Sequence, residues 1–190
     1  MSDLAAKANP IPLGLLGYGM STVLLSFANI GSYPVGGAVL AMGMFFGGIA
    51  QAIVAIMLFS KGDSFGVTAF GGYAFLWLSF AFINLGAGNG WWKVSDNEIG
   101  AYLLIWAVFT FGLVVASTVA PKVLTIILVL TVVLLGSLGL ATLNGNSSLS
   151  KFGGYEGVVT GALAIYLAFA FLINEMYGKE MLPIGKPFRK

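Results

Sequence analysis

The polar side chains within the first apolar stretch of the chain recur on one side of a helix. At about 100° per residue, one face carries two hydroxyl groups and an amide among small and apolar residues: Gly14, Tyr18, Thr22, Leu25 and Asn29. Such groups can replace water around a small polar solute, so this face could line a narrow path. They can equally bond neighbouring backbone at a helix–helix contact, and the pattern by itself favours that packing interpretation.

A second face of the same kind lies further along the chain and is richer in aromatic residues. It comprises Gly66, Phe70, Tyr73, Trp77, Phe80 and Asn84. Between the two faces, Gln51 follows the closely spaced glycines Gly43 and Gly47 by one helical turn. Small residues at this spacing let membrane helices approach closely. The Gln51 amide, by contrast, must find hydrogen-bond partners if it lies in a membrane.

The usual groups of enzyme chemistry are missing from this chain. It has 190 residues with no Cys and no His, which excludes disulfides, thiolate or imidazole metal sites, and Ser-His or Cys-His nucleophiles. The seven Asp and Glu residues do not cluster at metal-ligand spacing. We therefore expect no enzyme activity, no metal and no cofactor. A net charge of +2 without a basic run also argues against nucleic-acid binding.

The elements that position these residues follow from composition. Hydrophobic residues make up 58% of the chain and charged residues 8%, with a mean hydropathy of +0.96. A soluble domain devotes roughly a quarter of its residues to charged types, so most of this surface must face lipid. A spanning helix needs about 20 apolar residues. The polar and Gly/Pro breaks predict one all-α domain over residues 1–190, a bundle of six transmembrane helices at about 12–28, 35–59, 66–86, 98–118, 122–143 and 155–176.

The distribution of Lys and Arg predicts the orientation in the membrane. Seven lie on the side of the two termini: Lys7, Lys61, Lys122, Lys179, Lys186, Arg189 and Lys190. Two, Lys93 and Lys151, lie on the other side. We therefore expect a multi-pass protein of the cell (plasma or inner) membrane with both termini in the cytoplasm.

Ionisable groups are scarce inside the predicted helices. Glu156 and Glu175 are expected at the two ends of the last helix, separated by roughly 28 Å at about 1.5 Å per residue. That distance is too long for direct proton exchange. The residues therefore predict no proton pathway within the protein itself.

Several motifs, in order along residues 9–185, carry a family resemblance. They are Asn9-Pro10-Ile11-Pro12-Leu13-Gly14-Leu15, residues 47–51 (GGIAQ), residues 65–73 (FGVTAFGGY), residues 164–168 (AIYLA), Asn174-Glu175, and residues 182–185 (LPIG). Together they resemble the acetate uptake transporter family, also called succinate–acetate permeases. Position 11 is Ile where Ala is usual in that family.

The resemblance implies a homohexamer in which each protomer holds its own path for acetate and related short carboxylates such as succinate. It implies a tight point formed by Tyr18, Tyr73 and Thr131, where Thr131 replaces a common Leu and makes the point more polar. Four further residues would offer polar groups to the anion: Asn9, Thr22, Gln51 and Thr68. These implications favour the path interpretation of the two faces over packing alone.

Two other functions stay open at this stage. One is a channel for a small neutral solute such as urea or a short amide, which composition allows and the motifs disfavour. The other is a scaffold or assembly subunit without permeation. The residues also leave open whether flux is channel-like or linked to protons, which carboxylate is physiological, and how Thr131 affects selectivity.

Overall fold

The computed structural model describes residues 8–189, so Lys7 and Lys190 of the charge count lie outside it. The described residues form helices without strands: α1 (Ile11–Ile30), α2 (Gly37–Ala41), η1 (Met42–Ala50), α3 (Gln51–Phe59), α4 (Ser64–Gly88), α5 (Asp96–Ser117), α6 (Lys122–Asn144) and α7 (Ser147–Tyr177). Because α2, η1 and α3 run on without a break, there are six spans, each long and apolar enough to cross a membrane. The predicted six-helix, all-α fold is confirmed.

The first five spans begin and end within a few residues of the predicted limits, but the last one does not. Residues 144–154 are predicted as a loop, whereas α7 already begins at Ser147. The Asn146 side chain accepts a hydrogen bond from the Leu149 backbone amide at 3.0 Å and so caps the helix there. Glu156 is consequently nine residues inside α7 instead of at its start.

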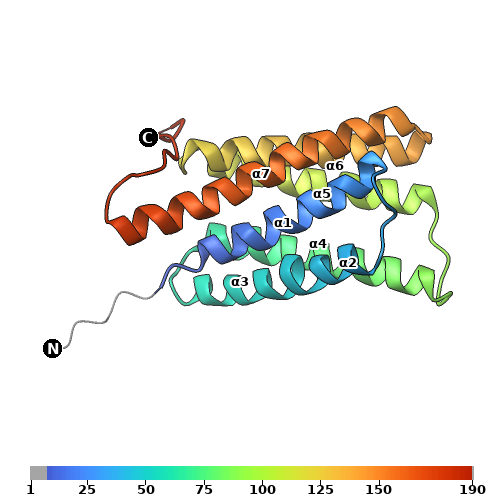
Figure 1. Cartoon of the computed structure of the whole chain (residues 1–190), viewed down its shortest axis with the longest axis horizontal. Coiled ribbons are helices and arrows are strands. Elements are labelled where there is room, and N and C mark those ends of the chain that lie inside the picture. The colour runs from blue at the N-terminus through green and yellow to red at the C-terminus, as the bar shows by residue number, and fades with distance from the viewer. Residues whose placement is uncertain (1–7, 190) are drawn as a thin grey trace.

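The six spans form a ring in chain order, because each contacts the next and the last contacts the first. Figure 1 shows the helices running along the long direction of the bundle. The α1 helix packs on one side against η1 and α3 and on the other against α7, while α6 packs between α7 and α5. The ring is weakest between α4 and α5, which make few direct contacts. The α1–α7 contact is close because Gly19 and Gly161 face each other, and a side chain at either would meet the opposite backbone. Antiparallel neighbours in a ring leave an interior that side chains from all six spans can line.

The second span departs from a regular α-helix over Met42–Ala50, which is a π-helix. The widened turns place Gly43 and Gly47 against the indole of Trp77 on α4, so that a Cβ at either position would collide with the ring. These two predicted packing glycines therefore seat an aromatic side chain. π-Helical segments are frequent at functional sites, and this one fixes the wall of a cavity described below.

The two ends of the described chain lie at the same end of the bundle (Figure 1). There the Lys61 ammonium donates to the Ala8 carbonyl at 2.6 Å, and the Lys122 amide donates to the Gly185 carbonyl at 3.3 Å. The Asn174 side chain holds the returning C-terminal segment, accepting from the Leu182 amide and donating to its carbonyl. The even number of spans is thus confirmed, while the side of the membrane on which the termini lie stays a prediction.

Candidate functional site

The centre of the ring is closed by Tyr18 of α1 and Thr131 of α6, whose hydroxyl oxygens lie 2.6 Å apart. The Thr131 hydroxyl donates to the Ile127 carbonyl at 2.7 Å, so the proton between the two side chains comes from Tyr18. The Tyr73 ring of α4 lies beside that of Tyr18, with centroids 5.2 Å apart. The Tyr73 hydroxyl donates to Thr110 at 3.1 Å. Two helices therefore contribute tyrosines and two contribute threonines to one hydrogen-bonded cluster at this point.

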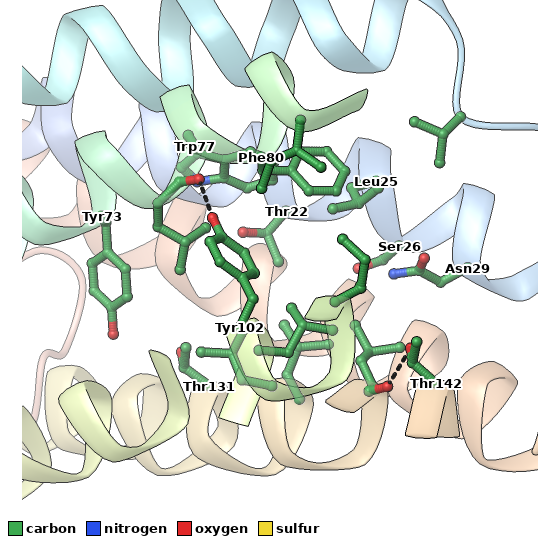
Figure 2. A pocket seen from close by; sticks show the side chains of 18 of the residues that line it. Thr22, Leu25, Ser26, Asn29, Tyr73, Trp77, Phe80, Tyr102, Thr131 and Thr142 are labelled. Carbon is green, nitrogen blue, oxygen red and sulfur yellow. Dashed lines mark hydrogen bonds between the residues drawn. The ribbon is translucent and has the colours of Figure 1, made fainter. Parts of the chain in front are cut away.

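A cavity lies on each side of this point. The terminal cavity, on the side of the described chain ends, has a volume of about 310 Å³. Its lining includes Ile11, Leu15, Gln51, Phe70, Leu124 and Phe171. The distal cavity, toward the opposite end, has a volume of about 190 Å³ (Figure 2). Its lining includes Thr22, Ser26, Asn29, Trp77, Tyr102 and Leu134. Tyr18 and Tyr73 line both cavities, so they form the partition between them.

Both predicted helix faces therefore turn toward the ring interior. On α1, Thr22, Leu25 and Asn29 line the distal cavity. On α4, Trp77 and Phe80 do the same, and Figure 2 shows Tyr73, Trp77 and Tyr102 around the space that Thr22 and Thr131 border. Two residues of these faces line neither cavity. Gly14 packs against the Phe70 ring, and the Asn84 amide donates to the Phe80 carbonyl at 2.8 Å.

The walls of the cavities hold polar atoms without protein partners. Among residues 8–189, three buried side-chain polar atoms have no hydrogen bond: Gln51 Oε1, Trp77 Nε1 and Glu156 Oε2. Gln51 belongs to the terminal cavity and Trp77 to the distal cavity. A buried donor or acceptor left unpaired costs about 1–3 kcal/mol, and such atoms commonly serve a ligand or water. Each cavity therefore has one lining residue with an unpartnered polar atom, an acceptor on Gln51 in the terminal cavity and a donor on Trp77 in the distal cavity.

Gln51 shows how this arises. Its side chain is fully buried, and its amide nitrogen donates to the Gly14 carbonyl at 3.2 Å. A carbonyl accepts but cannot donate, so this bond fixes the orientation of the amide and turns Oε1 away. The predicted need of Gln51 for membrane partners is thus met on one side only.

The four residues expected to offer polar groups divide into two pairs. Gln51 and Thr22 line the cavities, although the Thr22 hydroxyl already donates to the Tyr18 carbonyl at 2.7 Å. Asn9 and Thr68 line neither cavity. The Asn9 side chain accepts from the Ile11 amide at 3.1 Å and so helps to start α1, while the exposed Thr68 donates to the Ser64 carbonyl at 2.9 Å. A part for Asn9 and Thr68 in the path therefore stays a prediction.

Two residues of the site escaped the sequence analysis as functional candidates. Trp77 stood in the predicted face, but nothing along the chain indicates that its N–H lacks an acceptor. Thr110 holds the Tyr73 hydroxyl from a helix that begins after the next loop. Their roles depend on contacts between helices, for which a single sequence carries no local signal.

A ring of six apolar spans with paired interior cavities defines a polytopic membrane transport protein. A solved structure of the bacterial acetate channel SatP matches this one with a TM-score of 0.92 and 39% sequence identity, over 94% of this chain and 99% of that one. The succinate-acetate/proton symporter SatP of Escherichia coli (strain K12) is 39% identical over 180 residues, covering 94% of this chain and 96% of that protein. Ammonia transport outward protein 2 of Saccharomyces cerevisiae is 34% identical over 178 residues, covering 86% of this chain and 61% of that protein.

The sequence profile of the GPR1/FUN34/yaaH family matches residues 3–180. This chain belongs to that family. The resemblance stated from the motifs, to the acetate and succinate permeases, is thereby confirmed.

Proposed function

We propose that this chain carries acetate and related short carboxylates, including succinate, across the cell membrane through the interior of each protomer. The observation that carries the proposal is the pair of cavities that meet at Tyr18 and Tyr73, with Thr131 bonded to Tyr18. A fold shared with an acetate channel supports carboxylate as the substrate class. In this proposal Tyr18, Tyr73 and Thr131 are the constriction.

A carboxylate must be stripped of water to pass such a point, and an isolated ion in an apolar medium costs tens of kcal/mol in the idealised limit. Donors in the wall reduce that cost. Trp77 lines the distal cavity, and its buried indole N–H has no hydrogen-bond partner among residues 8–189, so it is the donor we assign to the substrate carboxylate. The apolar and aromatic side chains around it would then select small substrates by size.

The terminal cavity offers a different group. Gln51 Oε1 can accept but not donate, so it suits a water molecule or the O–H of a protonated acid more than an anion. The two cavities thus suit different states of the same small carboxyl group. The two cavities are compatible with channel-like flux and with flux linked to protons. SatP itself is named both as a proton symporter and as a channel.

We further propose the assembly and orientation expected from the sequence. Six protomers would form a homohexamer, each with its own path, and both termini would lie in the cytoplasm. Many large apolar side chains are exposed on the single chain, among them Phe59, Ile105 and Val108. Such a surface suits lipid or neighbouring protomers. Native mass spectrometry from a lipid-like detergent would give the number of protomers.

Flux into proteoliposomes tests the function directly. Acetate and succinate should enter faster than into protein-free vesicles, and urea should not. Ammonia belongs in the same assay because a yeast relative is named for its transport. Urea or ammonia flux without acetate flux would support the neutral-solute alternative and overturn our proposal. Absence of flux for all four solutes in vesicles with correctly folded protein would support a scaffold instead.

A further inference from the structure

Glu156 is the third residue with an unpartnered buried polar atom, and the cavities do not account for it. The Thr160 hydroxyl donates to its Oε1 at 2.6 Å, and Thr160 is fully buried. The second oxygen, Oε2, is inaccessible and has no hydrogen-bond partner among residues 8–189. The carboxyl group therefore has one neutral donor for two oxygens.

The depth of Glu156 in the bundle follows from its neighbours. It lies nine residues after the start of α7, which is about 14 Å along the helix at 1.5 Å per residue. The adjacent Gly157 packs against Ser26 of α1 and Leu134 of α6. Both of those residues line the distal cavity. Glu156 is therefore at the level of the distal cavity.

No ion pair within residues 8–189 compensates this carboxyl group. The α7 helix packs against α1 and α6, so these two helices supply its surroundings. Tyr18 is the titratable residue of α1, and Lys122 at the far end of α6 is the charged residue of that helix. On α7 itself, Lys151 lies five residues nearer the helix start and Glu175 nineteen residues further on. Glu156 forms no ion pair within the described chain.

An ionised carboxylate in this position would be unfavourable, because Glu156 is half-buried in a membrane span, one of its oxygens is inaccessible, and a single hydroxyl donates to the group. The neutral acid is the form that this environment favours. The position is not isolated from the path, however, since the neighbouring Gly157 packs against Ser26 and Leu134, which line the distal cavity. A change in the charge of Glu156 would therefore alter the potential in the distal cavity.

We propose that Glu156 is a proton-binding site and that its neutral form permits a carboxylate anion to occupy the distal cavity. In the binding step the Glu156 carboxylate takes a proton from hydronium, which leaves carboxylic acid and water. Ionised Glu156 would repel a second negative charge in the cavity. The second half of this inference rests on the proposed function, whereas proton binding does not. It goes beyond the expectation that the protein has no proton pathway of its own, which rested on the distance between Glu156 and Glu175 and did not consider Glu156 as a single proton-binding group.

Infrared spectroscopy of the protein in proteoliposomes tests proton binding without any transport. We expect a carbonyl band of a protonated carboxylic acid that persists to higher pH than the bands of the exposed Asp and Glu side chains. It should disappear in Glu156→Gln and remain in the matched control Glu175→Gln, at the other end of the same helix. Absence of such a band in the unchanged protein, or its survival in Glu156→Gln, would overturn the proposal. The first of these results is available even if the variant does not fold.

Acetate currents across planar bilayers test the effect on the anion, at a fixed acetate anion concentration and rising pH. Two unit charges about 10 Å apart at an effective dielectric of about 20 change occupancy on the order of tenfold. We expect the current of the unchanged protein to fall by about that factor as Glu156 ionises. In Glu156→Gln it should stay at its low-pH level, and in Glu175→Gln it should fall as before. If the pH profile of Glu156→Gln is identical to that of the unchanged protein, the effect of Glu156 on the anion is refuted. If the unchanged protein and both variants carry no acetate current, the proposed function is refuted, and the infrared result on proton binding still stands.

Discussion

The Tyr18 hydroxyl donates to the Thr131 hydroxyl across the centre of the helix ring, with 2.6 Å between the oxygens. Thr131 in turn donates to the carbonyl one turn earlier on α6. This chain of two bonds ties α1 to α6 at the partition between the two cavities. In the related family Leu is common where Thr131 stands, so the hydroxyl gives this protein a polar contact that an apolar side chain cannot make.

Thr131→Val should lower the stability of the folded protein and change its selectivity among carboxylates. The substitution keeps the shape but removes the acceptor for Tyr18, whose buried hydroxyl would then cost about 1–3 kcal/mol. We expect a lower unfolding temperature in detergent and a smaller ratio of acetate to propionate flux. Tyr18→Phe in the same background should recover part of the stability, since no orphan hydroxyl then remains. If the losses of Thr131→Val and Tyr18→Phe measured separately simply add up in the double variant, the bond contributes nothing.

Tyr73→Ala should widen the partition between the cavities. Tyr73 is 5% exposed and packs beside the Tyr18 ring, so its removal joins the two spaces. We expect larger carboxylates such as butyrate to enter proteoliposomes at least several-fold faster relative to acetate. The control Tyr73→Phe keeps the ring and should keep the size limit. Folded Tyr73→Ala protein with unchanged size selection would place the constriction elsewhere.

Trp77→Phe should weaken carboxylate binding with little effect on the fold, because it removes the N–H and keeps an aromatic ring against Gly43 and Gly47. A hydrogen bond to a charged group contributes about 1.5–3 kcal/mol, so the half-saturating acetate concentration should rise by about tenfold or more. Trp91→Phe, at an indole that is 63% exposed, is the matched control.

Nuclear magnetic resonance can observe the same donor directly. The indole N–H signal that is missing in Trp77→Phe should shift on addition of acetate and not on addition of acetamide. An unmoved signal, in protein that transports acetate, would remove Trp77 from the binding site.

The orientation of the protein in the membrane can be tested by cysteine labelling. The chain has no native Cys, so each introduced cysteine is its single reactive thiol. Single cysteines beside Lys93 and Lys151 should react with an impermeant maleimide added to whole cells. Those beside Lys61 and Lys122 should react only after the membrane is opened, because positive charge favours the cytoplasmic side. The reverse pattern would place both termini outside.

The sequence by itself determined the class of protein and most of its elements. Long apolar runs have no stable alternative to spanning helices, because lipid leaves backbone groups no other partners. The polar and glycine breaks at residues 29–34, 61–64 and 86–98 therefore located the loops, and the helical period identified the faces of Tyr18 and Tyr73 that turn inward. The N-terminal cap at Asn146 was not recognised from the sequence. The start of α7 was therefore predicted about eight residues too late, which put Glu156 at the start of the helix instead of nine residues inside it.

The tertiary structure decided which polar groups are free. Hydrogen bonds join Tyr18 to Thr131, 113 residues apart in the chain, and Tyr73 to Thr110, 37 residues apart. By contrast, Trp77 and Gln51 each keep one polar side-chain atom without a hydrogen-bond partner. The side chains of Asn9 and Thr68 form hydrogen bonds to backbone groups near their own positions and line neither cavity. Hydrogen-bond satisfaction depends on the packing of separate helices. For that reason the sequence could indicate the residues of the path, and only their arrangement in space could assign what each is free to bind.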